Sequence, residues 1–202
     1  MRLFVALELN TKVIENLTEL VRRLRPFGRV GWVHPRNMHV SLKYIGEWKV
    51  HRVDEIVRAL NRVRMPASLN VPLAGMGFFP NSRHPRVFWV GVENIPALRQ
   101  LGSGVDAELQ TLGIAPEVRP YFPHVTLARV LEGDPLDELH LAIEDLPSRE
   151  FGVITPDRFV LYESSPTNSG AVYRKISEFP ASVRESARKS EEKASPMLAG
   201  QL

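Results

Sequence analysis

The feature that most constrains the fold is a four-residue pattern that occurs twice. Histidine, any residue, a hydroxyl residue and leucine stand at 39–42 as HVSL and at 124–127 as HVTL, so the two histidines are 85 residues apart. Roughly 0.06 copies are expected by chance in a chain of this composition, so coincidence is a poor explanation of two. The surrounding residues predict a strand around each copy, at 38–46 and 122–130. The chain therefore contains two related halves, each with one histidine-bearing strand.

The rest of the chain repeats an order of strand, helix, strand, helix and paired strands. Apolar residues at helical spacing after residue 12 predict a helix that Asn10 or Thr11 caps and Pro26 ends. Further strands are expected at 2–9, 69–77, 86–93, 157–165 and 171–178, and further helices at 49–64, 96–113 and 135–143. This order predicts an α+β protein of two similar lobes, each with an antiparallel sheet and helices.

Residues 1–180 fit a single bilobal domain, and the remainder differs in composition. Residues 181–195 are charged and small, so we expect 181–202 to form a disordered tail. Over the whole chain, 44% hydrophobic and 24% charged residues are typical of a globular protein. Neither a run of about 18 apolar residues nor a secretory signal is present, so the sequence predicts a cytoplasmic protein without a membrane span.

Cysteine is absent, which excludes disulfides, thiolate nucleophiles and cysteine-ligated zinc. The charge is uneven: residues 1–94 carry 15 Lys and Arg against 7 Asp and Glu, whereas the remainder carries 11 against 16. A basic half suits a phosphate-bearing partner. A solvated helix face, such as the one that carries Arg58, Arg62 and Arg64, explains single arginines equally well.

The two histidine motifs combine residue types that suit displacement at phosphorus. Because alternate side chains of a strand share a face, His39 and Ser41 point one way, whereas Val40 and Leu42 point the other way and anchor the strand to the core. His124 and Thr126 repeat the arrangement. Opening a cyclic phosphodiester needs a water deprotonated on one side of phosphorus and an alkoxide protonated on the other, and two histidines can hold these opposite roles near neutral pH. The hydroxyls can bond the non-bridging oxygens, and this chemistry requires neither a metal nor a cofactor.

Other interpretations of these residues are weaker. Zinc bound by His39 and His124 would lack a nearby cysteine or a third histidine to complete its shell. A serine hydrolase is disfavoured because Ser41 lacks the flanking glycines of a nucleophile elbow. The remaining four histidines carry no motif and are expected to be structural or exposed; they are His34, His51, His84 and His140.

At this point the sequence resembles the two-histidine phosphoesterase superfamily, specifically the LigT-like RNA 2′,3′-cyclic phosphodiesterases once described as 2′-5′ RNA ligases. The resemblance spans about residues 1–180. It is carried, in the family's order, by both motifs and by MRLFVALEL, VGWVHPRNMHVSLKYIGE, GMGFFPNSRHPRVFWVGV, PEVRPYFPHVTLAR and FVLYESSPTNSGAVYRKISEF. It implies a bilobal α+β fold that flanks a central active-site groove.

The resemblance also implies the reaction and its participants. The family hydrolyses RNA 2′,3′-cyclic phosphate ends to 2′-phosphomonoesters, and transfer RNA fragments are among the possible substrates. By motif position His39 would be the proton donor and His124 the proton acceptor, with Ser41 where the family more often has threonine. We expect a monomer, since a bilobal groove is complete in one chain.

Four further residues are predicted to bind substrate. Lys43 follows Ser41 by two positions, so period-two alternation places it on the face of His39. Arg129 falls on the opposite parity and would reach the groove only past a twist or strand end. Phe4 and Tyr121, like Tyr44 and Phe79, could stack on a base, although burial in the core explains each of them as well.

Two other functions fit the same residues. The groove could run the reaction backwards as a 2′-5′ RNA ligase. A different class is a catalytically inactive RNA-binding module whose histidines only contact phosphate. Loss of turnover in His124→Ala separates an enzyme from such a module.

Overall fold

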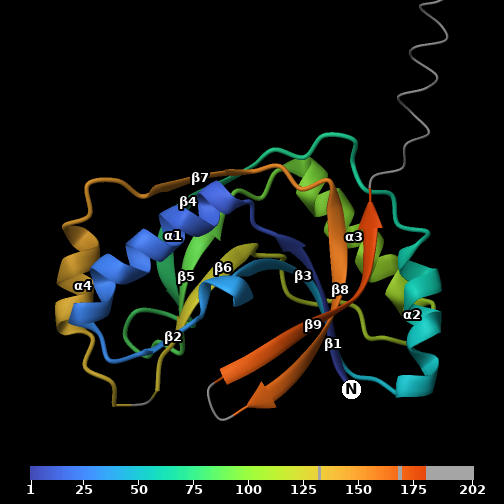
Figure 1. The fold of residues 1–202 in the computed structure, drawn as a ribbon, viewed down its shortest axis with the longest axis horizontal. Coiled ribbons are helices and arrows are strands. Elements are labelled where there is room, and N and C mark those ends of the chain that lie inside the picture. The colour runs from blue at the N-terminus through green and yellow to red at the C-terminus, as the bar shows by residue number, and fades with distance from the viewer. Residues whose placement is uncertain (132, 168–169, 181–202) are drawn as a thin grey trace, which may run out of the picture.

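The computed structural model describes residues 1–131, 133–167 and 170–180. These residues form a nine-stranded antiparallel sheet whose main path is β7-β4-β5-β6-β3-β1-β8-β9, with β2 added beside β6 (Figure 1). The strands are β1 Arg2–Glu8, β2 Gly31–Trp32, β3 His39–Glu47, β4 Val71–Phe79, β5 Val87–Val92, β6 His124–Arg129, β7 Glu150–Ile154, β8 Arg158–Thr167 and β9 Gly170–Pro180. The helices are α1 Thr11–Leu24, α2 Val53–Leu60, α3 Pro96–Gln110 and α4 Asp137–Glu144, with short 3-10 turns at Arg25–Phe27, Pro35–Asn37 and Val50–Arg52.

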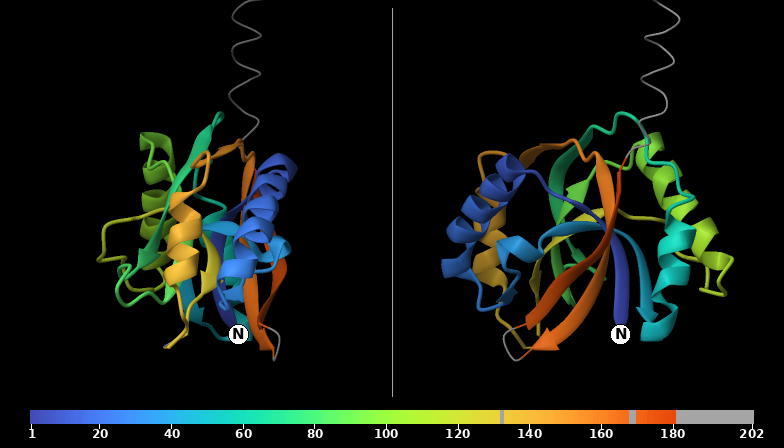
Figure 2. Two further views of the ribbon diagram at one scale, coloured as in Figure 1. Left: turned by 90° about the vertical axis from the view of Figure 1, so that its left-hand side faces the viewer. Right: turned by 45° about the vertical axis from the view of Figure 1, so that its right-hand side comes forward.

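The sheet divides into two lobes at its centre. The two histidine-bearing strands, β3 and β6, are joined there through the single residue pair Val40 and Val125. The first lobe contains β3, β1, β8 and β9 with α2 and α3, and the second contains β6, β5, β4, β7 and β2 with α1 and α4. Figure 2 shows the two helix pairs on opposite sides of the molecule. The predicted α+β fold with two similar lobes is therefore confirmed.

The lobes are not the two halves of the sequence, because each contains strands and one helix from the other half. Helix α1 follows β1 of the first lobe but packs on β7 of the second, and α3 follows β5 of the second lobe but packs on β3 of the first. Asn10 and Asn16 donate side-chain hydrogen bonds to the carbonyl oxygens of Val153 and Phe151, at 2.9 and 3.0 Å. This exchange ties the lobes together through both helices.

The apolar periodicity of the sequence places the helices correctly. Asn10 caps α1 by accepting a hydrogen bond from the backbone N–H of Val13 at 2.9 Å, as predicted. Helix α1 gives way to a 3-10 turn that contains Pro26, and α2 is shorter than expected because its first turn is 3-10. The buried residues of α1 at helical spacing are Val13, Leu17, Leu20, Val21 and Leu24.

Strand β7 was not predicted, because it is only five residues long and Gly152 interrupts its apolar residues. Gly152 within it has φ +109° where the strand meets α1, and a Cβ there would lie 3.2 Å from a methyl group of Val13. The tail predicted at 181–202 lies outside the described residues. Within those residues no helix is long and apolar enough to cross a membrane.

Candidate active site

The junction of β3 and β6 brings the two histidine motifs together. Val40 and Val125 pair across it and are fully buried, so the residues on either side of each valine face the opposite side of the sheet. One step further in the antiparallel register sets His39 opposite Thr126 and Ser41 opposite His124. The predicted imidazoles and hydroxyls thus form one diagonal cluster between the lobes.

These four side chains open into a cavity of about 390 Å³ between the lobes. The lining residues are Arg2, Phe4, Val33, Asn37, His39, Ser41, Tyr44, Val87, His124, Thr126, Arg129, Ser164, Ala171 and Tyr173. Two of them are arginines, and none of the described lining residues is an aspartate or glutamate. The cavity, called the catalytic groove below, therefore suits an anion.

Both imidazoles are held in the same way. The Nδ1 atom of His39 lies 2.7 Å from the carbonyl oxygen of Asn37, and that of His124 lies 2.9 Å from the carbonyl oxygen of Phe122. Because a carbonyl oxygen only accepts, each Nδ1 carries a hydrogen, which leaves each Nε2 to give or take a proton. The Nε2 atom of His39 lies 3.1 Å from the hydroxyl oxygen of Ser41. The arrangement is the one that general acid and base catalysis needs.

A β-bulge in each histidine strand changes the alternation after the hydroxyl residue. In β3, Ser41 and Lys43 pair with the consecutive residues Ala6 and Val5, so Leu42 is an extra residue. In β6, Thr126 and Ala128 pair with consecutive residues of β5, so Leu127 is extra in the same way. The bulges stand at equivalent positions of the two motifs, and each reverses the faces of the residues that follow it.

The first bulge turns Lys43 away from the catalytic groove, so the prediction that it shares the face of His39 is wrong. Lys43 is only 6% exposed, and its Nζ atom donates hydrogen bonds to Asp106 at 2.5 Å and to the carbonyl oxygen of Ala115 at 2.8 Å. Tyr44 faces the groove instead and is 60% exposed at its mouth. Simple alternation failed here because it assumes a strand without an extra residue.

The second bulge brings Arg129 into the catalytic groove, where strict alternation had not placed it. Its guanidinium has no carboxylate partner among the residues that the structure describes, and its positive charge acts on both histidines. Tyr44 and Arg129 are equivalent residues, each five positions after its histidine. The repeat spacing was the signal that could have identified Tyr44 as the counterpart of Arg129.

The aromatic candidates lie in three different places. Phe4 is 6% exposed and its ring centroid is 4.9 Å from that of His39, which makes it part of the groove floor. Phe79 makes the corresponding contact with His124, edge to face at 5.0 Å. Tyr121 does not line the catalytic groove; its hydroxyl donates to the carbonyl oxygen of Ser41 at 3.0 Å and holds the segment before β6 against β3. Tyr173 of β9, which the sequence did not single out, lies edge-on to His39.

The surroundings lower the pKa of both histidines. Burial has the largest effect on the pKa of His39, and the charges of His124 and Arg129 lower it further, against the raising effect of the Asn37 carbonyl. Burial also lowers the pKa of His124, helped by Arg129 and opposed by the Phe122 carbonyl. Both imidazoles are therefore predominantly neutral near pH 7 in the absence of a bound anion.

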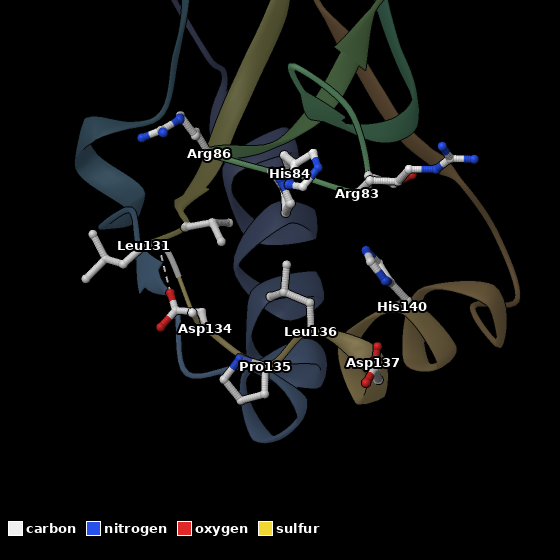
Figure 3. Close-up of a pocket in the computed structure, with 13 residues that line it drawn as sticks. Arg83, His84, Arg86, Leu131, Asp134, Pro135, Leu136, Asp137 and His140 are labelled. Atoms are coloured by element: carbon white, nitrogen blue, oxygen red, sulfur yellow. Dashed lines mark hydrogen bonds between the residues drawn. The ribbon is translucent and has the colours of Figure 1, made fainter.

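Another cavity, of about 460 Å³, lies between the β4–β5 turn and the start of α4. Figure 3 shows that the Arg83 and Arg86 side chains there point in opposite directions, away from a common centre. Asp134 and Asp137 lie across from them. Mixed charges and diverging arginines do not form an anion site, and neither His39 nor His124 lines this cavity.

The described residues contain no cluster of three or more His, Cys, Asp or Glu side chains that could hold a metal ion. The groove lining includes the imidazoles of His39 and His124, the hydroxyls of Ser41 and Thr126, and the guanidinium of Arg129. Such a set can transfer protons on two sides of a bound phosphate and stabilise its charge.

Comparison with known families matches this geometry. The model of the family described as LigT like Phosphoesterase matches the chain twice, at residues 7–89 and 90–173, so each match contains one histidine motif. The chain belongs to the LigT-like phosphoesterase family. The double match also explains why the two lobes of this LigT-like phosphoesterase place equivalent residues around one groove.

Related proteins cover almost the whole LigT-like domain. A Thermotoga maritima protein named RNA 2′,3′-cyclic phosphodiesterase is 36% identical over 183 residues, which is 88% of this chain and 94% of that protein. One from Thermus thermophilus with the same name is 32% identical over 189 residues, 89% of each chain. The crystal structure of the Thermus thermophilus protein TT0787 has a TM-score of 0.75 at 30% identity and covers 89% of this chain and 97% of that one. Escherichia coli LigT complexed with 3′-AMP shares the fold, with a TM-score of 0.71, 24% identity and the same coverage.

Proposed function

We propose that this chain is an RNA 2′,3′-cyclic phosphodiesterase that opens the cyclic phosphate to a 2′-phosphomonoester by acid and base catalysis with His39 and His124. The observation that carries the proposal is the pair of imidazoles, each fixed through Nδ1 by a carbonyl oxygen, around one groove that has arginines and no lining carboxylate among the described residues. Relatives at 32% and 36% identity bear the name of this activity.

The reaction requires two proton transfers. Water attacks phosphorus while the Nε2 atom of His124 takes its proton, and the bond from phosphorus to O3′ breaks as the Nε2 atom of His39 protonates that oxygen. The products are a 2′-phosphate and a free 3′-hydroxyl, and proton exchange with solvent restores both histidines. The assignment of donor and acceptor follows the family's motif order.

The lowered pKa values suit these roles in different ways. A lowered pKa keeps His124 neutral and able to accept a proton. His39 must be protonated to act as an acid, and the negative charge of a bound phosphate favours that protonated form. Arg129 would balance the phosphate charge, and the hydroxyls of Ser41 and Thr126 would bond its non-bridging oxygens.

RNA fragments that end in a cyclic phosphate, including those from transfer RNA, are the proposed substrates, and a single chain is the proposed active unit. Both histidine motifs of a single chain line the same groove, so no second chain is needed to supply either imidazole.

The test is hydrolysis of a 5′-labelled oligoribonucleotide with a 2′,3′-cyclic phosphate, in the presence of EDTA. His39→Ala and His124→Ala should each lower kcat by about 10²–10⁴. His51→Ala is the matched control, because His51 is exposed outside the groove, and it should keep the wild-type rate. Turnover that EDTA stops, or that survives both substitutions, would overturn the proposed mechanism.

A further inference from the structure

A third cavity, of about 590 Å³, adjoins the catalytic groove on the same face of the sheet. Trp89 of β5 pairs with Thr126, and Gly91 pairs with His124. Residues directly opposite each other in neighbouring strands present their side chains on one face, and both Trp89 and Gly91 line this cavity. It therefore continues the catalytic face from β6 across β5 towards β4, and we call it the β5 cavity.

The β5 cavity has an aromatic wall that leads to the catalytic imidazole. Trp89 and Phe122 meet at 5.1 Å between ring centroids, and Phe122 is 53% exposed. Phe79 contacts both of them, at 5.0 and 5.4 Å, and also contacts His124 at 5.0 Å. An exposed ring beside an active site offers a stacking surface for a planar group.

Part of the cavity lining is bare backbone. Gly75 and Gly91 carry no side chain there, and a Cβ on Gly91 would lie 2.4 Å from the carbonyl oxygen of Ala74. Gly91 therefore lets the backbone of β4 approach β5 closely, whereas a Cβ on Gly75 would meet no atom within 4 Å. A flat ligand can approach such a surface without displacing side chains.

The protein leaves two polar atoms of this lining unsatisfied. The indole N–H of Trp89 and the side-chain oxygen of Asn94 are buried and have no hydrogen-bond partner among the described residues. The amide nitrogen of Asn94 is used, since it donates to the carbonyl oxygen of Tyr121 at 3.1 Å. Both atoms are covered by protein atoms, so the aromatic wall, and not these two atoms, is the contact surface that the cavity offers to a ligand.

The charges of the β5 cavity distinguish a base from a phosphate. Glu93 is the charged residue among its described lining, and no arginine or lysine lines it. A phosphate would be repelled, whereas a nucleobase is uncharged and every base has a face that stacks on aromatic rings.

We propose that the β5 cavity is a subsite for a nucleobase of the RNA substrate other than the base of the reacting nucleotide. This inference rests on the proposed cyclic phosphodiesterase function and narrows its substrate class to oligonucleotides. Phe122 provides the stacking face. Because single-stranded RNA is commonly held by such stacking, the subsite favours RNA over a cyclic mononucleotide.

The test compares tetraribonucleotides that end in a 2′,3′-cyclic phosphate and carry one abasic position, moved in turn through the three nucleotides before the last. In the wild type one position should lower kcat/KM by about tenfold, the effect of one base stack. In Phe122→Ala, intact and abasic substrates should then react with nearly the same kcat/KM. Phe122→Leu should remove most of the difference as well. Phe27→Ala removes a comparably exposed ring from another part of the chain and should leave the wild-type ratio unchanged. Taking the ratio within each variant cancels any effect of the substitution on catalysis itself.

Three outcomes overturn the subsite. The first is that no abasic position lowers kcat/KM in the wild type. The second is that Phe122→Ala keeps the wild-type ratio of kcat/KM between intact and abasic RNA. The third is that Phe122→Ala lowers kcat/KM for 2′,3′-cyclic AMP as much as for the oligonucleotide, which would assign the ring to the reacting base. If the wild type hydrolyses none of these substrates, the proposed function fails separately. Equilibrium binding of the same RNAs then decides the subsite, and equal Kd values for intact and abasic RNA overturn it.

Discussion

The buried pair of Lys43 and Asp106 provides the sharpest prediction about stability. The Lys43 side chain is 4% exposed and that of Asp106 is 19% exposed, with 2.5 Å between Nζ and Oδ1. Asp106 also accepts a hydrogen bond from Gln110 and contacts the backbone N–H of Glu117. The pair therefore connects the back of the histidine strand β3 to α3 and to the segment that leads to β6.

Removing the carboxylate should cost more than removing the ammonium. Asp106→Ala leaves a buried positive charge whose remaining described partner is the carbonyl oxygen of Ala115, and breaking a buried pair in this way costs about 3–5 kcal/mol. Lys43→Met leaves a carboxylate that is partly solvated and still bonded to Gln110, so we expect a loss of about 1–2 kcal/mol. In Lys43→Met with Asp106→Leu both charges are gone, and stability should return to within about 1 kcal/mol of the wild type.

Urea unfolding followed by circular dichroism measures these differences. With a slope of about 2 kcal/mol per molar urea, Asp106→Ala should lower the midpoint by about 1.5–2.5 M. With Asp106→Leu measured as the matching single variant, the double-mutant cycle separates the interaction from the effects of the single changes. Equal losses in the two single variants that add in the double variant would refute the reasoning, because they would show that the charges are not coupled.

Three further predictions concern the catalytic groove. Arg129→Gln removes a cation that opposes protonation of both histidines, so their pKa values should rise. Both limbs of the plot of kcat/KM against pH should therefore move to higher pH. A profile that stays in place or moves to lower pH contradicts this. Ser41→Ala should lower kcat on a cyclic-phosphate RNA by about 10², whereas Ser41→Thr keeps a hydroxyl and should retain most activity; equal rates in the two variants would remove Ser41 from the reaction. Tyr121→Phe deletes the hydrogen bond to the Ser41 carbonyl and should cost about 1 kcal/mol, which lowers Tm by about 2–4 °C in calorimetry; an unchanged Tm would mean that this bond does not stabilise the fold.

The sequence alone predicted that the two histidines and their hydroxyl neighbours lie together, because the information for it is local and repeated. Within HVSL and HVTL, period-two alternation holds, so the faces of His39, Ser41, His124 and Thr126 follow from the strand geometry. The α+β class and most elements followed in the same way from apolar periodicity and from caps such as Asn10.

The tertiary structure decided what lies beyond each motif. The extra residues Leu42 and Leu127 are defined by how many residues the neighbouring strands β1 and β5 contribute, and neither motif contains that information. That pairing buries Lys43 and turns Arg129 into the groove. The exchange of α1 and α3 between the lobes, and the cavity beside His124, likewise depend on contacts between residues far apart in the chain. Local pattern fixes which face a side chain takes within an unbroken strand, whereas pairing between strands decides where that pattern breaks.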